Sequence, residues 1–229
     1  MPLIFQAVFH ETPLKSAVSM LPLCCTSVGF SIAAGVIVDA VRKYRWSIIV
    51  SWAISAIGCG LVVLWKPDSS LALTTGIQIL LGIGTGPFFA LLLLPMQASV
   101  VNVDDSGIAA GILVCFRLFG ALVSLAMSST VVSNVFISRI SSLGPLSEPV
   151  AVLTDVREAV SFIPTLRLVE ISPLIRTRVV EAYRRSLIAV FLMLAGFAVL
   201  GFLTSFFIKE ISIESDELGR QQMVEEKKE

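Results

Sequence analysis

The sequence is poor in charged residues and in the residue types from which soluble active sites are built. Only 15% of its 229 residues are Asp, Glu, Lys or Arg, whereas a typical soluble domain has about a quarter. The one histidine, His10, has no cysteine or acid at a spacing suited to a metal ion. The four cysteines form no CxxC pair, which argues against a zinc site and a disulfide framework. We therefore predict no metal, no cofactor and no catalytic residue, and hence no enzyme.

The chain also lacks an excess of charge of either sign. It has 17 basic and 17 acidic residues, so its formal net charge is zero. The basic residues occur as short clusters between apolar runs, which is not the extended basic surface that binds nucleic acid. No nucleic-acid partner is predicted.

What the sequence does contain is long apolar runs, and the mean hydropathy is +0.89. A helix of about 20 apolar residues crosses the ~30 Å hydrocarbon layer of a bilayer. Runs of this length predict an all-α, polytopic transmembrane helix bundle over residues 16–208, with the lipid bilayer as a partner. The predicted spans are 17–38, 46–65, 72–97, 107–134 and 186–208. Residues 1–15 are predicted to be the remnant of a preceding helix and an outer loop.

The loops predict an orientation. The first loop carries Arg42, Lys43 and Arg45, whereas the second carries only Lys66. Basic residues in short loops stay in the cytoplasm, so the first loop is predicted to be cytoplasmic. Alternation then places 135–185 outside and the tail 209–229 in the cytoplasm, where its mixed charge predicts disorder.

The outer segment 135–185 has a pattern of its own. Leu153, Val156, Val160 and Ile163 recur at helical spacing and predict an amphipathic helix on the membrane or capping the bundle. Ser172 before Pro173 is typical of a helix start that leads into the fifth span.

Residues 81–97, LGIGTGPFFALLLLPMQ, contain Gly82, Gly84 and Gly86 at alternate positions. A dinucleotide loop needs a different glycine spacing and a basic residue nearby, and neither is present. In a membrane helix, glycine lets a neighbouring backbone approach closely, while Pro87 and Pro95 remove backbone hydrogen bonds and bend the helix. The pattern fits either a moving contact surface or static close packing.

Arg117 is the only charged residue of the fourth span. A guanidinium at membrane depth is unfavourable unless it faces a cavity or a partner. We predict either a contact to substrate or to an acid on another helix, or a structural arginine that bonds backbone carbonyls or reaches toward the cytoplasm. One turn later, Gly120 is predicted to let a neighbouring helix approach.

Several uncharged polar residues are weaker candidates for lining a substrate path. Interhelical hydrogen bonding is the more common role of such side chains. They are Gln97, Ser124 and Ser128, with Gln78, Ser129 and Asn134 in the same class. No Asp or Glu lies inside any predicted span, so a titrating acid for proton-coupled transport would have to lie elsewhere.

The first loop and the runs around it carry a family resemblance. GVIVDAVRKYRW resembles the loop motif G-x-x-x-D-R-x-G-R-[KR] of the C-terminal half of major facilitator superfamily transporters. Ala40 stands where the motif has arginine, and Arg42 where it has glycine. The residues that keep its character are Gly35, Asp39, Lys43 and Arg45.

Other segments resemble the same family in order. LLGIGTGPFFALLLLPMQASV and the run with FRLFG are similar to spans twelve and thirteen of the fourteen-span drug:proton antiporter-like branch common in fungi, and AYRRSLIAVFLML to the start of span fourteen. The resemblance covers roughly residues 1 to 208. It implies one of two bundles that rock around a central site for a small-molecule substrate, in the plasma or the vacuolar membrane.

The resemblance implies that the first bundle, with most coupling acids, is not part of this sequence. We therefore predict part of an efflux-type transporter that is incomplete alone. Either a complementary N-terminal half or another transporter chain supplies the rest, or the sequence is a truncated product or an incomplete gene model. The alternative is a non-transporting membrane protein that acts by helix association with a partner. A membrane-embedded enzyme would need a cluster of His, Asp, Glu or Cys, and none is visible.

Overall fold

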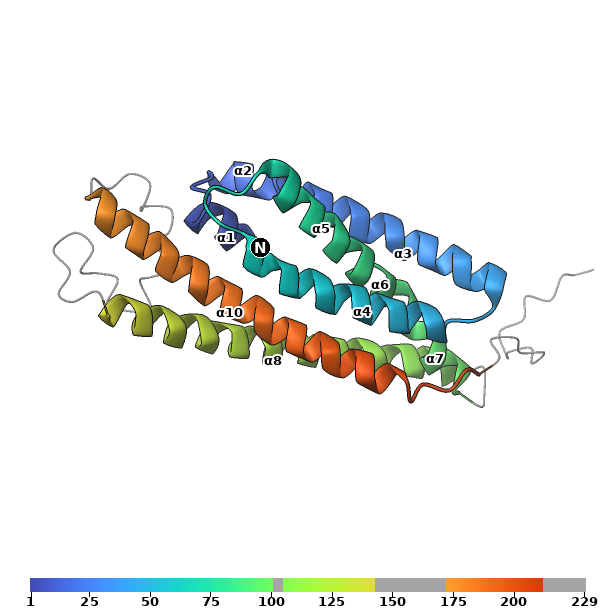
Figure 1. Ribbon diagram of the computed structural model, residues 1–229. Coiled ribbons are helices and arrows are strands. Elements are labelled where there is room, and N and C mark those ends of the chain that lie inside the picture. Colours follow the sequence, from blue (N-terminus) through green and yellow to red (C-terminus); the bar gives the residue numbers. More distant parts are fainter. Residues whose placement is uncertain (101–104, 143–171, 212–229) are drawn as a thin grey trace, which may run out of the picture.

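The computed structural model describes residues 1–100, 105–142 and 172–211. Within these ranges the chain forms helices and no strand, which confirms the all-α class. Five helical stretches are long and apolar enough to cross a bilayer, and together they form an elongated bundle (Figure 1). The stretches are Pro13–Val41, Arg45–Leu64, Leu71–Ala98, Ser106–Ser141 and Pro173–Ser205.

The helices begin where local sequence favours a start. The Thr12 hydroxyl accepts a hydrogen bond from the Lys15 N–H at 3.1 Å, and Pro13 follows it. The start predicted at Pro173 is confirmed. The elements in order are α1 (Pro2–Ala7), α2 (Pro13–Val18), α3 (Leu21–Val41), α4 (Arg45–Leu61), the 3-10 turn η1 (Val62–Leu64), α5 (Leu71–Thr85), α6 (Pro87–Leu91), α7 (Leu93–Ala98), α8 (Ser106–Ser141) and α10 (Pro173–Ser205).

The helices differ in length from the predicted spans. α8 continues to Ser141, beyond the predicted end at 134, and α10 begins at Pro173 rather than at 186. The predicted start at 186 followed the charges of Arg184 and Arg185, but a helix satisfies its own backbone in water as well as in lipid and can continue past the bilayer. The ends of segment 135–185 are therefore helical. The predicted amphipathic helix at 153–163 and the predicted disordered tail lie outside the described residues.

The prolines divide the predicted third span into three helical pieces. α5 ends at Thr85 and α6 begins at Pro87, and a second interruption falls at Leu92. Pro95 has no N–H to donate to the carbonyl of Leu91, four residues earlier, and its ring crowds that carbonyl. This stretch therefore follows a broken path rather than one straight helix.

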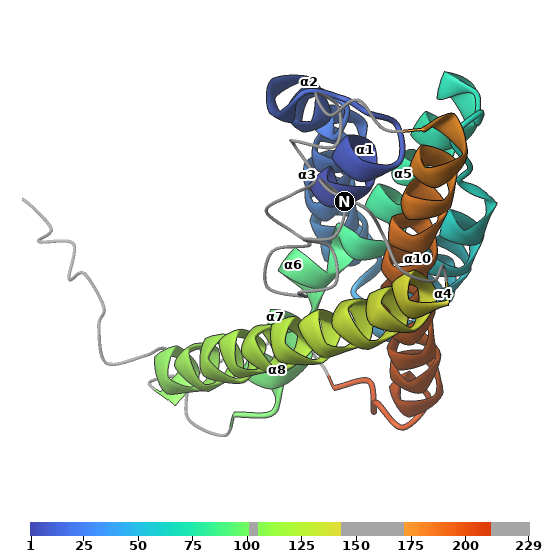
Figure 2. The same cartoon turned by 90° about the vertical axis from the view of Figure 1, so that its left-hand side faces the viewer.

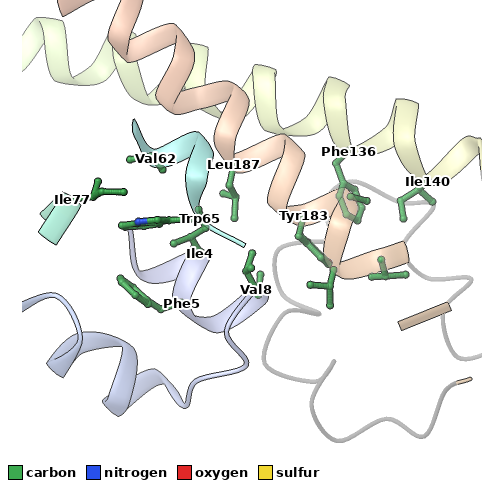
Figure 3. Packing of buried hydrophobic residues seen from close by; sticks show 14 of the residues in the cluster. Ile4, Phe5, Val8, Val62, Trp65, Ile77, Phe136, Ile140, Tyr183 and Leu187 are labelled. Carbon is green, nitrogen blue, oxygen red and sulfur yellow. The ribbon is translucent and has the colours of Figure 1, made fainter. Parts of the chain in front are cut away.

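One end of the bundle is held by a cluster of large buried side chains (Figure 3). The ring of Trp65 is fully buried after η1, and its centroid lies 5.6 Å from that of Phe5 in α1. Tyr183 of α10 packs on Phe136 of α8 with the centroids 4.4 Å apart. Because paired aromatic rings bury a large apolar area, they join α1, η1, α8 and α10 at this end.

The other end is closed by the segment after α10, residues 206–211, which we call the C-terminal strap. The buried Tyr44 backbone N–H donates to Glu210 Oε1 at 2.8 Å, and its hydroxyl donates to the Lys209 carbonyl at 3.2 Å. The same hydroxyl accepts from the Ile211 N–H at 3.0 Å. Arg45 also donates to the Phe206 carbonyl at 2.8 Å. The first loop and the strap therefore lie at the same end of the bundle.

The three alternate glycines lie at close contacts between helices. A Cβ added at Gly82 would meet the Thr26 hydroxyl of α3, and one at Gly86 would meet the Ser27 carbonyl. A Cβ added at Gly84 would lie 2.6 Å from the Ser55 backbone N of α4. Gly82 and Gly86 are four residues apart and share one face of the helix, whereas Gly84 lies between them and faces away. The α5 helix thus lies between α3 and α4 and approaches both through glycine.

We predict that Gly84→Ala destabilises the bundle by about 1–3 kcal/mol, because the new methyl group can be accommodated only if α4 and α5 move apart. Thermal unfolding of the detergent-solubilised chain, followed by the loss of helical circular dichroism, measures this effect.

The matched control is Gly76→Ala in the same helix, where an added Cβ meets nothing within 4 Å. Alanine is the better helix former by up to about 1 kcal/mol, so this variant should be neutral or more stable. Equal effects at the two positions would contradict the close contact at Gly84.

Tyr44→Phe tests the strap. It removes the donor to Lys209 and the acceptor for Ile211, which costs about 1–2 kcal/mol, or a factor of roughly 5–30 in the local opening equilibrium. Trypsin cleavage after Lys209, followed by mass spectrometry, should accelerate accordingly. Tyr183→Phe removes a hydroxyl at the opposite end and should leave this cleavage rate unchanged. An unaltered rate in Tyr44→Phe would show that the hydroxyl does not hold the strap.

Candidate functional site

The α8 helix lies at the edge of the bundle and crosses the others obliquely (Figure 2). Its main partners are α10 and α7. From Gly111 to Val135, which the structure describes in full, no residue of α8 is buried. Large apolar side chains such as Phe116, Phe119 and Leu122 are exposed there. An apolar face of this size marks either lipid contact or a surface that another helix covers.

A groove of about 640 Å³ lies between α3 and the α5–α6 stretch. Most of its wall comes from successive turns of α3, and the other side comes from the end of α5 and from α6. The lining residues are Leu23, Cys24, Ser27, Val28, Ser31, Ile32, Thr85 and Phe89. Its volume falls within the range of about 300–1,000 Å³ that is typical of small-molecule pockets.

Arg117 of α8 is not itself part of the groove wall, but it contacts Phe89, which is. Its guanidinium carbon lies 4.3 Å from the centre of the Phe89 ring, in a cation–π contact. Phe89 is itself 61% exposed. None of the ion pairs formed between described residues includes Arg117. The charge predicted to need a partner at membrane depth therefore meets an aromatic face.

The other path candidates on α8 fall on the same stripe. Arg117, Gly120, Ser124 and Ser128 follow one another at spacings of three, four and four residues, which keeps them on one helix face. Ser124 and Ser128 are half-buried. An added Cβ at Gly120 meets nothing within 4 Å, so no neighbour within the described chain makes the approach predicted there.

Gln97 is exposed in α7 and is not among the lining residues of the groove. Gln78 of α5 is 2% exposed, and its Oε1 accepts no hydrogen bond from the described residues. These two glutamines therefore do not join the groove.

Sequence reasoning missed Phe89 and the α3 side of the groove. The relevant signal was present, since Thr85 and Phe89 are four residues apart and share a face across the Pro87 interruption. Which aromatic residue would meet Arg117 depends on the crossing of α8 over α6, which local spacing does not specify.

The residues of the loop motif lie where α3 turns into α4. Arg42 ends α3 in the left-handed region at φ 57°, and its N–H donates to the Val38 carbonyl at 2.7 Å. A tight turn thus forms where the family motif has glycine, although a side chain disfavours this conformation. Asp39 pairs with Arg42 at 3.9 Å, with both side chains exposed.

The other motif residues differ in their surroundings. Lys43 is exposed, and an added Cβ at Gly35 meets nothing within 4 Å. Arg45 instead bonds to the strap, through the Phe206 carbonyl. Exposed ion pairs contribute little stability, so the strap rather than the Asp39 pair holds this end of the bundle together.

The described ranges contain no group of three His, Cys, Asp or Glu side chains that could hold a metal ion. In the parts of the chain that the structure describes, the groove next to Phe89 is the larger hollow suited to a small molecule. A second hollow, of about 300 Å³, lies between α8 and α10 and is lined by charged residues that include Arg139, Arg178, Glu181 and Arg185.

Comparison with known proteins gives relatives of one kind. The chain is 39% identical to the MFS-type transporter sphD of Aspergillus fumigatus, over 98% of this chain and 39% of that protein. It is 29% identical to the efflux pump FUS6 of Gibberella moniliformis, over its whole length and 40% of the pump. It is 30% identical to the MFS-type efflux pump LUC4 of a Fusarium species, over 99% of this chain and 40% of that pump.

No family model and no solved structure matches the chain. These three relatives nevertheless align with nearly all of it, while the chain spans only about two fifths of their length. The chain belongs to the fungal MFS-type transporters and corresponds to a part of such a protein.

Proposed function

We propose that this chain forms part of an efflux-type secondary transporter that exports small organic molecules by alternating access. The observation that carries this proposal is the match of nearly the whole chain to proteins named as MFS-type transporters and efflux pumps. The groove beside Arg117 supports it, because it offers a small molecule an apolar wall and a charge at membrane depth.

The substrate path is completed by a second bundle, from a complementary N-terminal half or another transporter chain. Two observations support this. The chain spans about two fifths of its relatives, and the stripe of α8 that carries Arg117 is open rather than covered. Transporters of this kind bind substrate at the interface of two repeats, so one bundle supplies one wall. The acid for proton coupling would lie on the other bundle.

Motion would be concentrated at α8. The close contacts of Gly82, Gly84 and Gly86 join α5 firmly to α3 and α4, and packed interfaces of this kind move as units. α8 makes few contacts along its middle, and the interruptions at Gly86 and Leu92 lie near the α6 and α7 pieces that it approaches.

The transport proposal is tested by joining the two parts. The chain is co-expressed with the part of the Aspergillus relative that it does not match, and everted membrane vesicles are given a pH gradient. Three fluorescent probes are offered: rhodamine 6G as a cation, Nile red as a neutral molecule and dansyl-undecanoate as an anion. We expect uptake of at least one probe with both parts present and none with either part alone, because one bundle lacks half of the path.

A protonophore added to the same vesicles is the control for passive partitioning of the probes. If the two parts purify together and none of the probes is taken up, the proposal is wrong.

We further propose that the protein resides in the plasma membrane with the first loop and the strap in the cytoplasm. Lys43 and Asp68 lie in loops at opposite ends of α4, so they face opposite sides of a membrane that α4 crosses. In a variant without the four native cysteines, Asp68→Cys should react with an impermeant maleimide on intact cells, and Lys43→Cys only after permeabilisation. The reverse pattern would invert the orientation.

A further inference from the structure

We propose that the α3–α6 groove and Arg117 together form a binding site for an amphiphilic organic anion. The apolar body of the ligand occupies the groove, and its carboxylate or sulfonate binds the guanidinium. This inference rests on the proposed function and names the substrate class of the same site.

The first step is that the groove and the charge share a residue. Phe89 lines the groove, and the centre of its ring lies 4.3 Å from the Arg117 guanidinium carbon. In this proposal the ligand extends past Phe89, where its charged group meets the guanidinium.

The second step concerns the charge that Arg117 still requires. A ring face attracts a cation but does not satisfy the five guanidinium N–H groups, which match a planar oxyanion in bidentate geometry. The ion pairs among the described residues use Lys15, Arg42, Arg184 and Arg185 instead. The sequence of the five predicted spans contains no Asp or Glu. An anion on the ligand would supply the missing partner, whereas a cation would be repelled.

The third step concerns the body of the ligand. The groove wall is mostly carbon, from Leu23, Val28, Ile32 and Phe89. The Thr85 hydroxyl donates to its own helix, to the Leu81 carbonyl at 2.8 Å. A wall of this kind binds apolar surface. A polar, sugar-like body would bind weakly, because its hydroxyl groups would lose their hydrogen bonds to water and find few partners in the groove.

An anionic lipid headgroup presents the same oxyanion chemistry to Arg117 as a free amphiphile. We commit to the free amphiphile, because the groove of about 640 Å³ is the size of one small-molecule body. The experiment separates these two sources.

The test measures binding to the full chain in phosphatidylcholine nanodiscs. The probes are dansyl-undecanoate and its uncharged methyl ester, followed by energy transfer from tryptophan, with empty nanodiscs as the blank. Trp52 packs against Phe88 with the ring centroids 4.3 Å apart, so an energy donor lies beside the residue that precedes Phe89. We expect saturable binding of the acid and weaker binding of the ester.

Substitutions at Arg117 test whether its charge binds the acidic group of the probe. Arg117→Gln should weaken binding of the acid about tenfold or more, as expected for the loss of a charge-assisted pair, and leave the ester unchanged. Arg117→Lys should retain part of the binding, since it keeps the charge but loses the fork. Arg139→Gln removes a charge from a separate, smaller hollow that Arg178 and Arg185 also line, and it should bind both probes like the unaltered chain; weaker binding of the acid in this variant would place the acid in that hollow instead. Ser31→Phe fills the groove and should weaken both probes.

Three further outcomes would overturn the proposal. The first is equal binding of acid and ester. The second is an Arg117→Gln variant that binds the acid normally. The third is displacement of the acid by phosphatidylserine in the nanodisc, which would assign the site to a lipid headgroup. If Arg117→Gln fails to fold, Ser31→Phe and Arg117→Lys still decide the outcome.

The transport assay keeps this inference separate from the proposed function. Uptake of rhodamine 6G or Nile red by the joined parts, without binding of dansyl-undecanoate, would leave a transporter whose substrate is not an anion. Anion binding by the chain without uptake of any probe by the joined parts would keep the site and refute transport.

Discussion

Close approach of helices through glycine is the constraint on which this bundle depends. Within lipid, burial of apolar surface does not drive helices together, so association depends on van der Waals contact at short range. The α5 helix satisfies that need on two faces, toward α3 through Gly82 and Gly86 and toward α4 through Gly84. The groove lies beside this contact, and α6 continues the packing on α3 beyond Pro87, where Leu91 is buried against Ala34 and Val38.

Much of this architecture could be predicted from the sequence, because its strongest signals are local. Charge-free runs predict the five apolar helices, and Ser172 with Pro173 predicts the start of α10. The interruption near Pro87 likewise follows from a missing N–H. The predicted start at 186 followed Arg184 and Arg185, whereas α10 begins at Pro173, and α8 likewise continues past the predicted end at 134. Backbone hydrogen bonding and membrane depth are separate properties.

What could not be predicted depends on contacts between distant segments. Phe89 meets Arg117 only because α8 crosses α6 at a particular angle. Tyr44 lies in a short loop without a local pattern that marks it, yet it bonds Glu210 and Lys209 at the far end of the chain. Arg42 adopts a left-handed backbone conformation that usually favours glycine. Its N–H donates a hydrogen bond to the Val38 carbonyl, which closes the end of α3. Such features are set by tertiary geometry, which spacing alone does not encode.

The strap has a consequence for how this chain tolerates change. Tyr44 binds the Lys209 carbonyl and the Ile211 N–H through a single oxygen, and Arg45 binds Phe206. These are backbone groups, so the bonds themselves do not depend on the strap side chains other than Glu210, although Ile208 also packs against the Tyr44 cluster. Insertion or deletion of one residue between Phe206 and Lys209 would move Lys209, Glu210 and Ile211 away from Tyr44 while Phe206 stays beside Arg45. Between these two residues, length is under stricter constraint than composition.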